Sequence, residues 1–234
     1  MCPVLRADLE TTRDAQWDQL RDLLLAYAAR RPVDRVAVVG NAPLPPDAGR
    51  AAAIDAADLV IRQNSFVLDA QGGEPTVGTA CHVVVLSRAT TFTPWTLRDH
   101  RDRAFLVPQA GFVEYRPGDE IGLLLHAGFW PPDLGAMPLP NAVVKARLVR
   151  TLDPTAEPGS LIPTSGTTAL FLAHEMFPGA DLVGTGFSFL DDVDQTSWSH
   201  HSGGHTRLNR RHRLDLEAAL LRSWIADGSL RHLS

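Results

Sequence analysis

Cysteine is nearly absent from this sequence, which contains only Cys2 and Cys81 among 234 residues. Cys2 lies at the terminus, so a structural disulfide between the two is not expected. Free thiols are typical of reducing compartments, and the sequence therefore predicts a cytoplasmic location. Long apolar runs are absent as well, and residues 1–20 are too charged for a signal peptide. We therefore predict no membrane span and no secretory leader.

A large excess of charge of either sign is also missing. The net charge of -5 at pH 7 argues against nucleic acid as a partner, although four arginines cluster at Arg207, Arg210, Arg211 and Arg213. A hydrophobic content of 44% and a charged content of 21% are ordinary for a globular protein. With no internal repeat and no clear linker, the chain is predicted to form a single domain over residues 1–234.

The glycine-rich loop of dinucleotide-binding proteins is absent, although the stretch "RVAVVG" begins like one. Gly40 is followed only by Gly49, too far away for the G-x-G-x-x-G pattern. Asn41 stands where a second glycine would be expected, and Asn64 follows the next predicted strand. An asparagine amide can donate to a phosphate or ribose oxygen, so the pair is a candidate nucleotide grip. Alternatively, both are turn residues that tolerate unusual backbone angles.

Buried strands and amphipathic helices alternate along the chain. This order predicts an α/β fold, a Rossmann-like domain whose open, mainly parallel sheet is flanked by helices on both faces. Ligands in such sheets bind beyond the carboxyl ends of the strands. Proline-rich residues 108–140 show no clear period and are predicted to form a long irregular connection. The predicted strands span 35–40, 57–63, 81–87, 104–108 and 181–187, and the predicted helices 13–30, 138–151, 165–177 and 206–227.

The stretch "PTSG" immediately precedes one of these predicted helices. The first amides of a helix lack partners within it and, with the helix dipole, form an anion site. Thr164, Ser165, Gly166 and Thr167 would then contact a phosphate. The alternative is an ordinary N-cap, which is very common.

Histidines gather between positions 200 and 212. The spacing of His200, His201, His205 and His212 fits no helical pair of metal ligands and no cysteine lies nearby, so a general base or a phosphate donor is the better interpretation. Upstream, "LDDVDQ" offers an aspartate-x-aspartate pair at positions 192 and 194. Such a pair holds a metal and a nucleotide diphosphate in some glycosyltransferases, but here it is more simply a solvated loop. No metal is predicted.

Taken in order, these stretches resemble the animal-type sialyltransferases of glycosyltransferase family 29. Residues 38–64 are similar to the family's long motif "VVGNSG…G..ID..D.V.R.N", and residues 163–187 to its short motif "P.SG…A……V…GF". "HRLDLE" at 212–217 is similar to its final H-x-x-x-x-E. The family's third motif has a histidine followed by an aromatic residue, whereas this chain has His200-His201-Ser202 there. The chain departs from the family at Asn41-Ala42-Pro43, where the family has Asn-Ser-Gly, and in lacking the cysteines of the family's disulfide.

The resemblance implies a variant of the GT-A-like sialyltransferase fold and an inverting, metal-independent transfer. A sialic-acid-like sugar would pass from a CMP-activated donor (CMP, cytidine monophosphate) to a hydroxyl of a small-molecule or glycan acceptor, with no further cofactor. Two alternatives remain: a hydrolase that cleaves a cytidine nucleotide or CMP-sugar, and a CMP-binding protein without catalysis.

Specific roles follow from the motif positions. His212 would take the proton of the acceptor hydroxyl, and His201 would donate to the departing phosphate, with His200 as its alternative in this motif. Gly40 and Glu217 would support the site, Glu217 by orienting either nearby backbone or His212. The nucleotide would be held by Asn41, Asn64, Thr164, Ser165, Gly166, Thr167 and His200.

Overall fold

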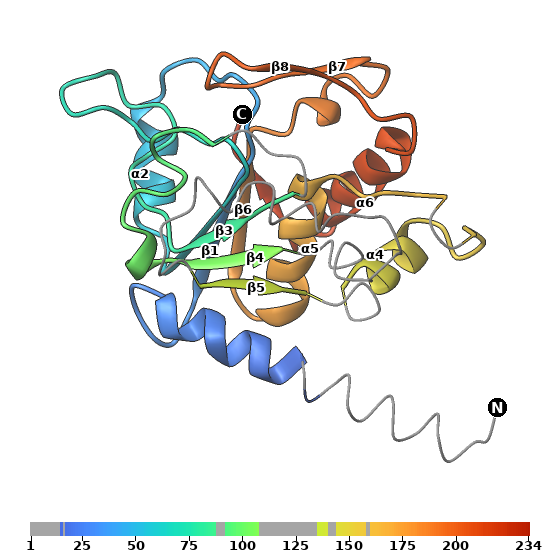
Figure 1. Cartoon of the computed structure of the whole chain (residues 1–234), viewed down its shortest axis with the longest axis horizontal. Helices are drawn as coiled ribbons and strands as arrows, with labels where there is room; N and C mark the ends of the chain where they lie inside the picture. Colours follow the sequence, from blue (N-terminus) through green and yellow to red (C-terminus); the bar gives the residue numbers. More distant parts are fainter. Residues whose placement is uncertain (1–14, 16, 88–91, 108–134, 140–143, 158–159) are drawn as a thin grey trace, which may run out of the picture.

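The computed structural model describes residues 15, 17–87, 92–107, 135–139, 144–157 and 160–234, and within them the predicted α/β fold is confirmed (Figure 1). Seven strands form one sheet in the order β5-β4-β3-β2-β1-β6-β9, and every neighbouring pair runs parallel. The strands are β1 (Arg35–Val39), β2 (Leu59–Gln63), β3 (Val83–Val85), β4 (Ala104–Val107), β5 (Ala136–Pro138), β6 (Asp181–Thr185) and β9 (Arg231–His232).

Helices cover both faces of this sheet, as the alternating sequence predicted (Figure 1). A small antiparallel hairpin of β7 and β8 stands apart from the sheet, above α5 and α6 in the view of Figure 1. The helices are α2 (Ala48–Asp55), α4 (Lys145–Leu152), α5 (Ser165–Met176), α6 (Leu214–Ala226) and one through residues 17–27. The short 3-10 turns are η1 (His100–Asp102) and η4 (Ser188–Leu190). The hairpin strands are β7 (Ser197–Ser199) and β8 (His205–Arg207).

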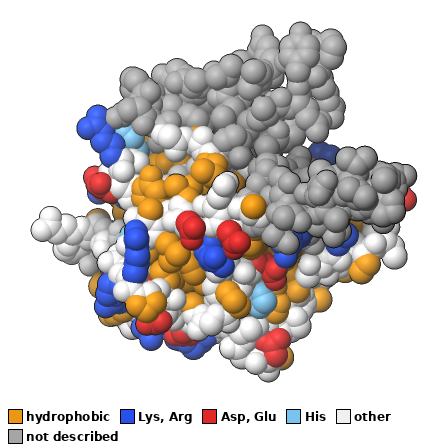
Figure 2. All heavy atoms as spheres, turned by 90° about the horizontal axis from the view of Figure 1, so that it is seen from below, with side chains coloured by type: hydrophobic (Ala, Val, Ile, Leu, Met, Phe, Trp, Pro, Cys, Tyr) orange, Lys and Arg blue, Asp and Glu red, His pale blue; other side chains and the backbone are white. Residues whose placement is uncertain are grey.

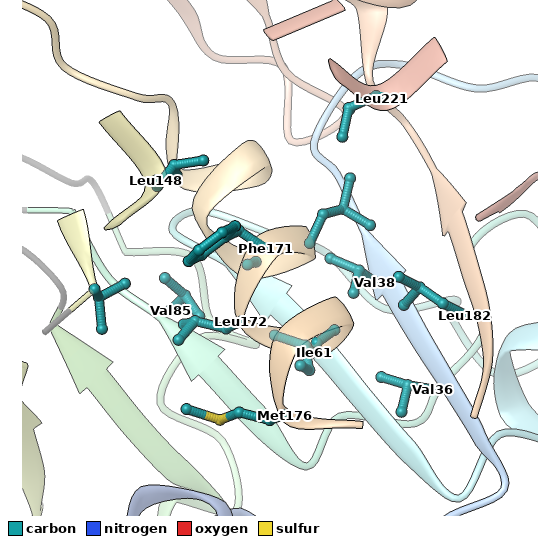
Figure 3. Packing of buried hydrophobic residues seen from close by; sticks show 14 of the residues in the cluster. Val36, Val38, Ile61, Val85, Leu148, Phe171, Leu172, Met176, Leu182 and Leu221 are labelled. Carbon is teal, nitrogen blue, oxygen red and sulfur yellow. The ribbon is translucent and has the colours of Figure 1, made fainter. Parts of the chain in front are cut away.

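The sheet is apolar on both faces, which explains why its strands form continuous hydrophobic runs. Along β1, Val36 and Val38 point into the larger core beneath α5, whereas Ala37 and Val39 pack with the smaller cluster beneath α2. Figure 3 shows the larger core, in which Phe171 of α5 lies among side chains of the sheet and of the neighbouring helices. Because α5 is buried over most of its surface, it is fixed rigidly against the strand ends that carry the site.

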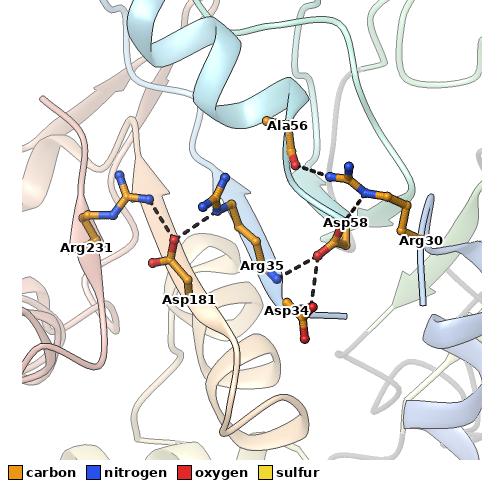
Figure 4. Close-up of polar contacts among 7 residues, drawn as sticks. All are labelled: Arg30, Asp34, Arg35, Ala56, Asp58, Asp181 and Arg231. Atoms are coloured by element: carbon orange, nitrogen blue, oxygen red, sulfur yellow. Dashed lines mark hydrogen bonds and ion pairs between the residues drawn. The ribbon is translucent and has the colours of Figure 1, made fainter. Parts of the chain in front are cut away.

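Two aspartates, the buried Asp58 and the exposed Asp181, tie the amino ends of the strands together (Figure 4). Asp58 accepts hydrogen bonds from the backbone amides of Asp34 and Arg35 at 3.0 and 2.9 Å, and from the Arg30 guanidinium at 2.7 Å. Asp181 accepts from the side chain of Arg35 at 3.0 Å and from a second arginine on β9 at 2.9 Å. The carboxyl ends of the strands, at the opposite edge, are left free for a site.

Some predicted boundaries are wrong. The helix expected over 206–227 begins only at Leu214, because the polar stretch before it lacks an apolar period and forms β8 and a loop. The helix expected over 138–151 likewise begins at Lys145. Residues 136–138, expected to be irregular, form β5, while 108–134 lie outside the described residues.

The face shown in Figure 2 carries acidic and basic side chains side by side, with hydrophobic groups between them and no field of one sign over the described atoms. This mixture agrees with the modest net charge of the chain. No helix in the described ranges is both long and apolar enough to cross a membrane.

Candidate functional site

A cavity of about 960 Å³ lies at the carboxyl ends of the central strands, where parallel α/β sheets bind their ligands. Its wall is built from residues that follow β1, β2 and β6, from the start of α5 and from the β7–β8 hairpin. The volume lies at the upper end of the range for small-molecule pockets and is sufficient for a nucleotide with an attached sugar. Of the predicted residues, those that line it are Asn41, Asn64, Thr164, Ser165, Gly166, His200 and His212.

Two glycines explain how β1 and β6 open onto this cavity. The amide of Gly40 donates to the carbonyl of Thr185 at 2.7 Å, and the amide of Ala42 donates to that of Gly186 at 3.1 Å. A Cβ on Gly40 would lie 2.0 Å from the Gly186 oxygen, and Gly186 has a φ of +76°. Only a residue without a side chain fits at position 40, and this close approach carries the next residue to the cavity wall.

Asn41 and Gln63 meet at the bottom of the cavity. The Nδ2 group of Asn41 donates to the backbone carbonyl of Gln63 at 2.8 Å, which orients the amide. The side-chain oxygens of both residues are buried and have no hydrogen-bond partner in the part of the chain that the structure describes. Buried polar atoms are nearly always satisfied, so two orphan groups beside one cavity point to a polar ligand. Sequence reasoning missed Gln63, because a glutamine at a strand end is usually solvated.

Asn64 is a turn residue, one of the two roles that the sequence left open, and its side chain also lines the cavity. It has a φ of +49°, so it is a turn residue in the left-handed region. Its Oδ1 accepts from the amide of Ser87 at 2.7 Å, while its Nδ2 forms no hydrogen bond within the described chain. The side chain therefore fixes its own turn with one atom and keeps a donor for a ligand in the cavity that it lines.

Glu217 supports the start of α5 rather than His212. This carboxyl group is fully buried on α6 and accepts from the amide and hydroxyl of Thr164 at 3.0 and 2.6 Å, and from the Thr167 hydroxyl. Thr164 is in turn the N-cap of α5 and accepts from the Thr167 amide at 3.1 Å. Neither Thr167 nor Glu217 lines the cavity, so both hold in place the helix start that does.

This buried carboxyl group predicts a pH-dependent stability. Burial raises the pKa of Glu217 from 4.5 to about 7, against the opposing effect of the two threonines. Between these values the folded chain binds more protons than the unfolded chain, so the free energy of unfolding falls as pH rises, by up to about 1.4 kcal/mol per pH unit. Glu217→Gln should remove this contribution to the decline, as urea titrations between about pH 5 and about pH 7 would reveal. An unchanged slope would contradict the prediction.

His212 lies just before α6 with one ring nitrogen fixed. Its Nδ1–H donates to the carbonyl of Ile162 at 2.6 Å, which leaves Nε2 as the acceptor. Burial lowers the pKa of His212 below its usual value, the contact with Ile162 opposes this, and the charges of Arg211 and Lys145 lower the pKa further. Trp198 packs edge-on against the ring at 6.4 Å. The imidazole is therefore neutral near pH 7 and oriented to accept a proton.

The two adjacent histidines of the β7–β8 turn point to different surroundings. His200 lines the cavity with His212, whereas His201 does not. The Nδ1 of His201 accepts from the amide of Leu44 at 3.4 Å, and its own amide donates to the carbonyl of Asn41 at 2.7 Å. The aspartates at 192 and 194 are exposed after η4 and also lie outside the cavity wall.

The charged residues of the long motif form the frame around this site. Arg62 is completely buried and donates to the carbonyls of Val77 and Ala80 at 2.7 and 2.8 Å, which fixes the loop after β2. Asp55 accepts from the backbone amides of Thr79 and Ala80 in the same loop. Together with Asp58 at the other end of the strands, these residues explain the motif's charged positions without any contact with a ligand.

Sequence reasoning also missed the charge of the cavity. Lys145, Arg207 and Arg211 line it, and no aspartate or glutamate does among the residues that the structure describes. The arginine cluster in the sequence was a signal for two of these cations, but nothing marked Lys145. In the same described ranges, no three His, Cys, Asp or Glu side chains gather in a way that could hold a metal ion.

Comparison with known proteins shows which solved structures share this fold. No protein-family profile and no curated protein sequence matches the chain. Its α/β fold resembles that of sialyltransferases: the crystal structure of a mammalian sialyltransferase matches with a TM-score of 0.55 and 16% identity, over 86% of this chain and 69% of that chain. A mammalian sialyltransferase in complex with Gal-beta-1-3GalNAc-ortho-nitrophenol matches with a TM-score of 0.53 at the same identity and coverage. At this identity the likeness shows the fold alone.

Proposed function

We propose that this protein is a glycosyltransferase that moves a sialic-acid-like sugar from a CMP-activated donor to an acceptor hydroxyl, with inversion. The observation that carries the proposal is the position of His212. Its ring is fixed through Nδ1, its Nε2 has no partner among the described residues, and it lines the same cavity as Asn41, Asn64 and the start of α5. The resemblance of the fold to that of sialyltransferases supports this proposal.

The nucleotide phosphate binds at the start of α5. The amides of Ser165 and Gly166 belong to the first turn, where no partner exists within the helix, and the helix dipole adds a partial positive charge. Asn64 donates from its Nδ2 and His200 donates to the phosphate oxygen as it leaves. Of the two adjacent histidines, His200 is the one whose position in the cavity wall supports this role.

The transfer itself is a single displacement. The acceptor oxygen forms a bond to the anomeric carbon while the bond from that carbon to the phosphate oxygen breaks. The proton of the acceptor passes to Nε2 of His212, and the electron pair of the broken bond leaves with CMP. Attack from the side opposite to the leaving phosphate inverts the anomeric centre.

A thermal-unfolding screen of mononucleotides tests the donor class. CMP at about 100 times its Kd should raise the free energy of unfolding by about 2.7 kcal/mol, which corresponds to roughly 5–10 °C for a chain of this size. Uridine and guanosine monophosphates should give much smaller shifts. A preference for a nucleotide diphosphate, or no shift with CMP, would overturn the proposal.

Asn64→Asp tests the contact between Asn64 and the nucleotide without disturbing the turn. Aspartate keeps the oxygen that accepts from Ser87 and tolerates the left-handed backbone, but it replaces the Nδ2 donor by a negative charge. We expect the Kd of CMP to rise by at least about tenfold. Gln71→Glu, which adds the same charge at an exposed loop position, is the matched control and should leave the Kd unchanged. Equal effects of both substitutions would remove Asn64 from the site.

A further inference from the structure

Every permanently charged side chain in the described cavity wall is a cation, although the chain as a whole carries 27 acidic and 22 basic residues. The surface in Figure 2 shows no such separation, since both signs mix there. The cations come from two distant segments: Lys145 opens α4, whereas Arg211 lies in the loop before α6. Only the fold brings them to one wall.

Lys145 and Arg211 both lie close to His212. Burial lowers the pKa of Lys145 and the charge of Arg211 lowers it further, while both cations lower the pKa of His212. Three basic groups thus share one corner of the cavity. Placing the charge of Arg211 beside the half-buried ammonium of Lys145 costs free energy, and a bound anion would offset that cost.

These two cations have no acidic partner in the described chain, in contrast to their neighbours. Arg213, two residues after Arg211, pairs with Asp215 at 2.6 Å. Arg147, two residues after Lys145, pairs with Glu175 at 3.3 Å. These two neighbours do not line the cavity and form ion pairs, whereas Lys145 and Arg211 line it and form none with the described residues.

The proposed donor phosphate does not account for this excess of positive charge. A phosphodiester carries one negative charge, and the neutral donors at the start of α5 and Asn64 serve it. The pair beside His212 is left without an anion. The planar guanidinium of an arginine matches a carboxylate with two parallel hydrogen bonds, and a lysine adds a compact charge.

We propose that Lys145 and Arg211 form a carboxylate-binding subsite next to His212. The inference rests on the proposed function and narrows its substrate class to ligands with a carboxylate near the reacting atoms. A sialic-acid-like donor bears its carboxylate on the anomeric carbon, so this subsite would place that carbon beside the base. A carboxylate on the acceptor would use the same contacts with Lys145 and Arg211, and it would place the acceptor hydroxyl beside His212.

The donor is tested by comparing two ligands of similar total charge, CMP and CMP–N-acetylneuraminate. Calorimetry would measure both Kd values in a Lys145→Gln/Arg211→Gln double variant. The Kd of the conjugate should rise by a factor about 10–100 times larger than the factor by which the Kd of CMP rises. Arg210→Gln, a neighbouring exposed position outside the cavity wall, should change neither. Arg211→Gln alone, at an exposed site, should give a smaller shift in the same direction and guards against misfolding of the double variant.

The acceptor is tested by comparing lactose with sialyllactose, which differ by a carboxylate-bearing sugar. If the subsite serves the acceptor, the double variant should raise KM for sialyllactose by at least about tenfold and leave that for lactose unchanged. The subsite would be overturned if the double variant bound CMP and its conjugate with equally weakened affinity and showed no difference between the two acceptors. In that case, binding of CMP by the unchanged protein would still support the proposed function. Failure of the unchanged protein to bind CMP would instead overturn both.

Discussion

His212→Ala should lower the rate of sugar transfer by roughly 10²–10⁴-fold, the usual contribution of general acid–base assistance. The ring is half-buried, its Nδ1–H is held by Ile162, and its Nε2 has no partner among the described residues, so the alanine variant loses the oriented nitrogen that we assign as the base. The affinity for CMP should change little, because the base contacts the acceptor. Single-turnover transfer rates and CMP titrations measure the two quantities separately. A loss below about tenfold would sink the assignment of the base.

His212→Asn separates the position of this side chain from its basicity. The asparagine amide can still donate to the Ile162 carbonyl, but it cannot accept a proton near neutral pH. We expect a loss as large as that of the alanine variant. Only the neutral ring of His212 is a base, and burial lowers the pKa of this ring below the usual 6.5. In the unchanged protein, kcat/KM should therefore rise with pH as His212 loses its proton, at a pKa below 6.5. Both variants should lack this dependence.

Products decide between transfer and the alternatives. With a CMP-activated sugar acid and a galactoside, mass analysis should show the acceptor enlarged by one sugar. Free sugar acid formed equally with and without acceptor would favour a hydrolase, and intact donor would favour a protein that only binds CMP. The His212→Ala variant should bind the donor but release neither product.

Much of the fold was predictable because the strands of a doubly covered parallel sheet are continuous apolar runs, and β1 and β6 stand out as such. The start of α5 was also marked, since Thr164 is a preferred N-cap. The helix α2 was missed, because its alanine-rich sequence has almost no polar–apolar period. The β7–β8 hairpin was missed for a different reason: each strand has only three residues, and β8 is exposed and polar.

The lining of the cavity was predictable where a residue closely follows a strand or begins a helix, as Asn41, Asn64 and Ser165 do. His200 and His201 lie in the turn between β7 and β8, a hairpin that the sequence did not reveal, so sequence alone could not choose between them. Gln63 and Lys145 carry no local signal, since their place in the cavity depends on contacts between distant segments. Spacing could not settle Glu217 either, because its partners lie 50 and 53 residues away in the chain.

Gly40→Ala should have the largest effect on stability, lowering the free energy of unfolding by at least about 3 kcal/mol. The new Cβ would lie 2.0 Å from the carbonyl oxygen of Gly186 and 2.6 Å from its carbonyl carbon. Both atoms are backbone, so no side-chain rotation relieves the clash. The ends of β1 and β6 must separate, which breaks the 2.7 Å hydrogen bond from Gly40 to Thr185. Urea unfolding at fixed pH measures the loss.

Gly179→Ala is the matched control, because its Cβ would meet no atom within 4 Å and its backbone is outside the left-handed region. Its free energy of unfolding should change by no more than about 0.5 kcal/mol. Since the same close approach of Gly40 and Gly186 carries Asn41 to the cavity, any Gly40→Ala protein that folds should also bind CMP more weakly. A folded variant with a loss under about 1 kcal/mol and unchanged CMP affinity would contradict the role of this glycine pair in building the site.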